Sequence, residues 1–91
     1  MNLNVSPEKL RDFARYVGNF SRGIAEDCQQ LATALNNLSS NLSAAERQSI
    51  VNMVKTIINI LKEGQPTLSA LKSEIESYAD YVQTFQTMAS N

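Results

Sequence analysis

The sequence predicts an all-α fold, an antiparallel helical hairpin that dimerises into a four-helix bundle. The main observation is that apolar residues recur at alternating steps of four and three, once in each half of the chain. This 3.5-residue period keeps one stripe of a helix turned toward a partner helix over its whole length. A short polar segment at residues 39–43 separates the two stripes, and so short a loop makes the helices antiparallel neighbours.

The chain has 91 residues, enough for one domain, 1–91. A domain of this size removes only about 60% of its unfolded surface from water. Its stability therefore depends on very regular packing or on another chain.

The first helix is expected over about residues 7–40. Ser6 suits the N-cap, Pro7 suits the first helical position, and Glu8 places negative charge near the positive end of the helix dipole. The stripe of this helix consists of Leu10, Ala14, Val17, Ser21, Ile24, Cys28, Leu31, Leu35, Leu38 and Leu42.

Beside this stripe, Phe13 and Phe20 add apolar width on one side. On the other side Gly18, Ala25 and Ala32 have little bulk, so we expect a partner backbone to approach closely there.

The single cysteine, Cys28, lies on the first stripe and is interpreted as a small buried hydrophobe. The alternative is a symmetric disulfide across a dimer axis. A nucleophilic role is not expected, because the chain has no histidine to activate a thiolate.

The turn is expected at about residues 40–43. Ser43 and Glu46 have the spacing of a capping box, in which the hydroxyl and the carboxylate each accept a hydrogen bond from an otherwise unpaired backbone N–H. The second helix should therefore begin at Ala44.

The second helix is expected over about residues 44–88, with a kink near 64–66. Its stripe consists of Ile50, Val54, Ile57, Leu61, Gly64, Leu68, Leu71, Ile75, Tyr78, Val82, Phe85 and Ala89. Pro66 removes a helix hydrogen bond and clashes with the preceding turn. Because the period continues through Gly64 without a slip, we favour a kinked continuous helix over a short break that would split it.

Both helices are apolar beyond their stripes, and two helices can cover only one strip of each other. The second stripe is flanked on its two sides by Val51 and Ile58, and by Met53, Ile60, Tyr81 and Met88. Such surplus apolar surface indicates an interaction site. We predict an interface formed by Leu10, Phe13, Val17, Phe20, Ile24, Leu31, Leu35, Leu38, Leu42, Ile50, Val54, Ile57, Leu61, Leu68, Leu71, Ile75, Tyr78, Val82 and Phe85.

The composition argues against several classes of function. Eight Lys and Arg against nine Asp and Glu give a net charge of −1, far from the positive field of a nucleic-acid-binding protein. The most apolar stretch, residues 50–61, contains Asn52 and Lys55 and is too short to span a bilayer. Residues 1–7 contain neither the basic segment nor the apolar segment of a signal peptide. We therefore expect either a cytoplasmic protein or secretion without a signal peptide.

No motif for catalysis, a cofactor or a metal is apparent. Without histidine and with one cysteine, transition-metal sites lack their usual ligands, and the three glycines form no phosphate-binding loop. Most acids lie on helix faces away from the stripes, whereas Asp27 and Glu74 lie at a stripe edge, where a charge across an interface is the favoured role. Tyr78, Tyr81 and Phe85 are interpreted as core aromatics rather than a ligand-stacking patch. We therefore expect a non-enzymatic protein.

The whole chain resembles the WXG100 (ESAT-6-like) proteins, small helical hairpins of about a hundred residues with a central turn. Residues 5–14, Val-Ser-Pro-Glu-Lys-Leu-Arg-Asp-Phe-Ala, are similar to the usual opening of the first helix in that family. The family's L-x-x-x-W-x-G pattern would fall on residues 38–44, where Leu42 replaces the tryptophan and Ala44 the glycine. The family's C-terminal pattern, Tyr followed four residues later by an acid, is also missing: Val82 follows Tyr78, and Phe85 follows Tyr81.

The resemblance implies a homo- or heterodimer of bacterial origin that is a substrate or accessory of type VII (ESX) secretion. Its partner would be a second copy or a paralogous hairpin, and the missing C-terminal pattern makes export dependent on that partner. Two alternatives stay open: a cytoplasmic adaptor that covers the helical targeting region of a larger secreted effector, and a structural subunit of a filament.

Overall fold

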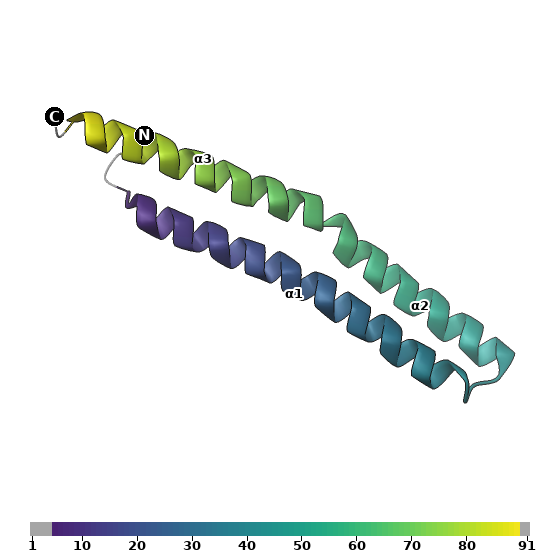
Figure 1. Cartoon of the computed structure of the whole chain (residues 1–91). Helices are drawn as coiled ribbons and strands as arrows, with labels where there is room; N and C mark the ends of the chain where they lie inside the picture. Colours follow the sequence, from purple (N-terminus) through teal and green to yellow (C-terminus); the bar gives the residue numbers. More distant parts are fainter. Residues whose placement is uncertain (1–4, 90–91) are drawn as a thin grey trace. The chain divides into compact units, whose positions relative to one another are not determined.

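The computed structural model describes residues 5–89 and contains three helices and no strand within that range. The helices are α1 (Pro7–Ser39), α2 (Ala44–Glu63) and α3 (Gln65–Ala89), and α1 and α2 are joined by a turn at residues 40–43 (Figure 1). The all-α helical hairpin predicted from the sequence is confirmed. Part of the segment used above to argue against a signal peptide, residues 1–4, lies outside the described residues.

The chain forms two compact units. Unit 1 comprises Met1–Ser21 and Pro66–Asn91, and therefore contains the first part of α1 together with α3. Unit 2 comprises Arg22–Gln65, and contains the rest of α1, the turn and α2.

The first turn of α1 is capped as its sequence predicts. The Lys9 backbone N–H donates to the Ser6 hydroxyl oxygen at 3.3 Å, and the Leu10 N–H donates to the Ser6 carbonyl at 3.1 Å. The first bond satisfies a backbone donor that has no partner within the helix, and the second is the first i→i−4 bond of α1. Ser6 is therefore the N-cap, and Pro7 begins the helix.

Unit 1 packs α1 against α3 through small side chains. Ala14 and Val17 of α1 and Ala79 and Val82 of α3 are buried, the last two with no exposed surface. A Cβ atom on Gly18 would lie 3.0 Å from Lys72 Cε, so the aliphatic part of the lysine occupies the space above this glycine. The side chain of Lys72, rather than another chain, therefore lies above Gly18.

The inward face of α3 differs from the predicted stripe at Leu71 and Phe85, which are exposed. Leu68, Ile75 and Val82 lie inward as expected. At the positions between them, Lys72, Ala79 and Gln86 are at least partly buried, whereas Leu71 and Phe85 are exposed and Tyr78 is partly buried. The alternating period is kept, but Lys72, Ala79 and Gln86 each lie one residue after the corresponding position of the predicted stripe. Small residues at the contact let two helices approach closely, and larger side chains then fit only at the edge.

In unit 2 the rest of α1 packs against α2 through partly buried aliphatic side chains. Cys28 is 3% exposed and no residue of α2 is fully buried. The partly buried side chains here are Ile24, Leu35, Leu42, Ile50, Val51, Val54 and Ile58. The interpretation of Cys28 as a buried hydrophobe is confirmed, and its free thiol lies away from the surface, where a disulfide to another chain would have to form.

The turn is held by side chains of the first turn of α2. Ser43 and Glu46 form the predicted capping box: the Glu46 N–H donates to the Ser43 hydroxyl oxygen at 3.3 Å, and the Ser43 N–H donates to Glu46 Oε1 at 3.1 Å. Arg47 adds a link that the sequence did not reveal, because its guanidinium donates to the carbonyls of Ser39 (2.9 Å) and Leu42 (3.2 Å). A cation of α2 therefore caps the C-terminal end of α1.

The capping box is expected to weaken in acid. Hydrogen bonds from the Ser43 side chain and then from its backbone N–H hold the pKa of Glu46 below its usual 4.5. The folded pKa is therefore lower than the unfolded one, so this stabilisation is present above the unfolded pKa and is lost as pH falls through the folded pKa. We expect far-UV circular dichroism to show part of the helix signal disappearing over that acid range. The Glu46→Gln variant should not show this acid-dependent loss of helix signal. If the variant shows the same loss, Glu46 is not the cause of the loss.

Gly64 separates α2 from α3. Its backbone (φ −80°, ψ −15°) stays in the right-handed helical region, and its N–H donates to the Lys62 carbonyl. Pro66 is the second residue of α3, where its missing N–H removes no bond within the helix.

Candidate interaction surface

More of the large apolar side chains of this chain are exposed on its surface than are fully buried. Among residues 5–89 the buried hydrophobic residues are only Ala14, Val17, Cys28, Ala79 and Val82. The large exposed ones are Phe13, Tyr16, Phe20, Leu31, Leu38, Met53, Ile57, Ile60, Leu61, Leu71, Tyr81, Phe85 and Met88. Of the bulky apolar side chains in the described residues, only Val17 and Val82 are thus buried within a single chain.

The predicted interface residues fall into three groups. Val17 and Val82 are buried within the chain. Partly buried are Leu10, Ile24, Leu35, Leu42, Ile50, Val54, Leu68, Ile75 and Tyr78. Exposed, and so available to another molecule, are Phe13, Phe20, Leu31, Leu38, Ile57, Leu61, Leu71 and Phe85. The interpretation of the C-terminal aromatics as core residues is wrong for Tyr81 and Phe85, which are both exposed.

One side of unit 1 is charged. Arg11 Nη2 lies 2.7 Å from Asp80 Oδ1 and links α1 to α3. On the same side the Lys72 ammonium lies 3.0 Å from Glu76 Oε2. An ion pair within α1, Arg15 to Asp12 at 2.9 Å, adds to the charge of the first helix. These groups are largely exposed, so each pair contributes little to stability, about 0–1 kcal/mol.

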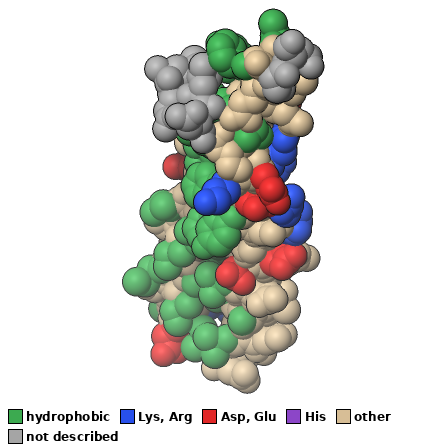
Figure 2. Space-filling model, turned by 90° about the vertical axis from the view of Figure 1, so that its left-hand side faces the viewer, with side chains coloured by type: hydrophobic (Ala, Val, Ile, Leu, Met, Phe, Trp, Pro, Cys, Tyr) green, Lys and Arg blue, Asp and Glu red, His purple; other side chains and the backbone are tan. Residues whose placement is uncertain are grey.

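The opposite side of unit 1 is apolar and aromatic. The Arg11–Asp80 pair and the contact of Lys72 with Gly18 fix which flanks of the two helices meet on the charged side. Helical geometry then places Phe13 and Phe20 of α1 on the other side. The flank of α3 that joins them there carries Leu71, Tyr78 and Phe85. In Figure 2, hydrophobic side chains gather in a band along one side of the displayed face, and a group of Lys, Arg, Asp and Glu side chains lies beside it.

Unit 2 carries a similar apolar flank. Leu31 and Leu38 of α1 lie one heptad apart, and both are exposed. On α2 the large exposed apolar side chains are Met53, Ile57, Ile60 and Leu61. Met53, Ile57 and Ile60 recur at steps of four and three, and Leu61 lies four residues after Ile57. No cation interrupts these α2 positions.

Sequence reasoning omitted five exposed apolar residues from the interface: Tyr16, Met53, Ile60, Tyr81 and Met88. Four of them were recognised as flanking residues of the second stripe. Tyr16 was missed, although its steps of three from Phe13 and four to Phe20 place it on their flank of α1.

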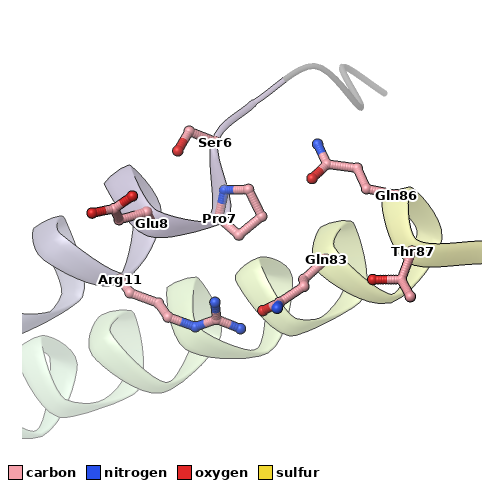
Figure 3. A pocket seen from close by; sticks show the side chains of 7 residues that line it. All are labelled: Ser6, Pro7, Glu8, Arg11, Gln83, Gln86 and Thr87. Atoms are coloured by element: carbon pink, nitrogen blue, oxygen red, sulfur yellow. The ribbon is translucent and has the colours of Figure 1, made fainter. Parts of the chain in front are cut away.

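One hollow of the surface is lined mainly by polar side chains. It has a volume of about 430 Å³, lies in unit 1 and is lined by Ser6, Pro7, Glu8, Arg11, Gln83, Gln86 and Thr87 (Figure 3). Arg11 reaches across it from α1 toward Gln83 of α3 (Figure 3), and its guanidinium is bound to Asp80. The Gln86 amide donates to the Val5 carbonyl at 3.2 Å. The polar groups of this hollow hold the end of α1 against α3, and nothing in it resembles an acid–base pair.

No group of three or more His, Cys, Asp or Glu among residues 5–89 is arranged to hold a metal ion. In the same part of the chain, none of the helices combines the length and apolar character needed to cross a membrane. Comparisons with models of known protein families, with curated proteins and with solved structures give no match to this chain.

Proposed function

We propose that this chain is a non-enzymatic, WXG100-like interaction protein that acts as a homo- or heterodimer, as a substrate or accessory of bacterial type VII secretion. One observation carries the interaction role: bulky apolar side chains on every helix remain exposed in the single chain. The opening of α1 and the hairpin layout support the family resemblance.

The mechanism is association rather than chemistry. Removing apolar surface from water contributes about 25 cal/mol per Å², and helices with unpaired apolar flanks gain this energy by packing against other helices. The charged side of unit 1 has its cations paired with carboxylates and stays in water, so it would form the outer surface of a bundle. The secretion role rests on the resemblance, and in the absence of the Tyr-x-x-x-acid pattern we propose export together with a partner.

Light scattering coupled to gel filtration tests the association. We expect the purified chain of 10.1 kDa to elute as a dimer, or as a complex with a co-expressed second hairpin from the same locus. A well-folded monomer that binds no such hairpin at micromolar concentration would contradict the interaction role. Loss of export from a host strain that lacks its type VII machinery tests the secretion role separately.

A further inference from the structure

We infer that the partner is a second copy of this chain, which docks its α1 antiparallel on this α1 with Lys9 of each copy opposite Asp27 of the other. This inference rests on the proposed function, because it names the partner of the same apolar flank. It concerns a set of six residues on one helix, called here the outer stripe: Lys9, Phe13, Tyr16, Phe20, Gly23 and Asp27.

The outer stripe has the period of a coiled-coil contact. Its members follow one another at steps of four, three, four, three and four along the continuous helix α1. The three aromatic side chains are each at least half exposed, and Lys9 and Asp27 are exposed at the two ends. Among residues 5–89 neither Lys9 nor Asp27 forms an ion pair. The stripe is therefore a helix-packing surface without a partner inside the chain.

Gly23 is the residue that the single chain does not explain. Glycine destabilises a helix interior relative to alanine, and it is kept where backbone must be approached closely or where φ is positive. No glycine of the described chain has a positive φ, and a Cβ at position 23 would meet nothing within 4 Å. Gly18, in contrast, is covered by Lys72. The notch at Gly23 is thus open on the outer stripe, where a large side chain from outside can enter it.

Antiparallel pairing of the stripe with itself fills that notch. In antiparallel coiled coils the two kinds of stripe position lie opposite each other. With the two-fold axis near residue 18, Phe13 meets Gly23 of the second copy, and Tyr16 meets its Phe20. The large and small side chains then interlock, and the aromatic pairs lie at the centre.

The charges select this register and this direction. Only the register centred near residue 18 places Lys9 opposite Asp27 of the other copy at both ends of the contact. A shift of one heptad places Lys9 against Phe20, or Asp27 against Tyr16, and leaves a charge against an aromatic ring. Parallel pairing would place Lys9 against Lys9 and Asp27 against Asp27, which repel each other.

Disulfide trapping tests the geometry. In a Cys28→Ala background, Lys9→Cys and Asp27→Cys proteins are prepared separately and then mixed under mild oxidation. We expect a cross-linked dimer in the mixture and little in either protein alone. In the proposed register the same cysteine position on the two copies is separated by about 27 Å along the helix axis, too far for a disulfide. Cross-linking of Lys9→Cys with itself would overturn the inference and leave the proposed function intact. A chain that is monomeric alone but pairs with a different hairpin would do the same, whereas a monomer that binds neither would overturn both.

A second pair of variants tests the notch. Gly23→Leu should raise the dimer dissociation constant at least about tenfold, measured by sedimentation equilibrium, because the added side chain fills the space for Phe13. Ala25→Leu is the matched control, since Ala25 is exposed on the other flank of α1 and should leave the constant unchanged. Leucine is a strong helix former, so neither change weakens α1 itself. Equal dissociation constants for the two variants would overturn the inference.

Discussion

Val82→Asp is expected to unfold unit 1. The Val82 side chain has no exposed surface and is the largest fully buried side chain among the described residues. No cation is among the buried residues, so an aspartate there would be a buried charge without a partner, at a cost of about 3–5 kcal/mol. Since a small domain has a total stability of only about 5–15 kcal/mol, the helix signal in far-UV circular dichroism should weaken strongly and lose its cooperative thermal transition.

Thr84→Asp is the matched control for this substitution. Thr84 lies two residues further along α3 and is exposed, so the same carboxylate should stay in water there and change the melting temperature little. If Val82→Asp melted like Thr84→Asp, the packing of α3 against α1 described here would be wrong.

The ends of the helices could be predicted because they depend on local chemistry. Ser6 and the Ser43–Glu46 pair accept or donate hydrogen bonds within four residues of themselves, so the sequence alone contains both partners. The Arg47 bonds to Ser39 and Leu42 could not be predicted in the same way. They depend on how the chain turns between the two helices, which residue spacing does not specify.

The phase of α3 was the main error, and its cause lies in the other helix. Leu71 and Lys72 are neighbours, and hydrophobicity alone assigns the leucine to the inside. The buried Ala14, the bare backbone at Gly18 and the buried Ala79 instead favour a close approach of the two helices. At that distance a lysine stem fits over the glycine while its ammonium stays near Glu76. A pattern on one helix cannot contain this information.

The candidate interaction surface could be predicted as a surplus of apolar side chains, but not as a particular flank. The sequence showed that Phe13 and Phe20 lie beside the stripe of α1, and that Met53 and Ile60 lie beside that of α2. It did not show which side chains the hairpin itself would cover. That division follows from the shifted phase of α3, which moves Leu71 and Phe85 from the inside to the flank.

Ile57→Asp is expected to abolish association while leaving the hairpin folded. Ile57 is 49% exposed on α2, so an aspartate there remains hydrated in the single chain and costs its fold little. In a bundle the same carboxylate would be buried against another hairpin. Losing the isoleucine removes about 1.5–3 kcal/mol of apolar burial, and the desolvated charge adds to this. Each 1.4 kcal/mol is a factor of about ten in affinity, so the dissociation constant should rise by at least about a hundredfold.

Light scattering for mass and circular dichroism for helix content, measured on the same samples, separate the two effects of this substitution. Asn59→Asp is the control, because it places the same carboxylate two residues away on the outer surface of α2 and should keep both the dimer and the helix content. An Ile57→Asp chain that lost its helix together with its dimer would mean that each hairpin requires its partner in order to fold. An Ile57→Asp chain that kept its dimer would show that the flank formed by Met53, Ile57 and Ile60 faces water in the assembly, and that association uses α1 and α3 alone.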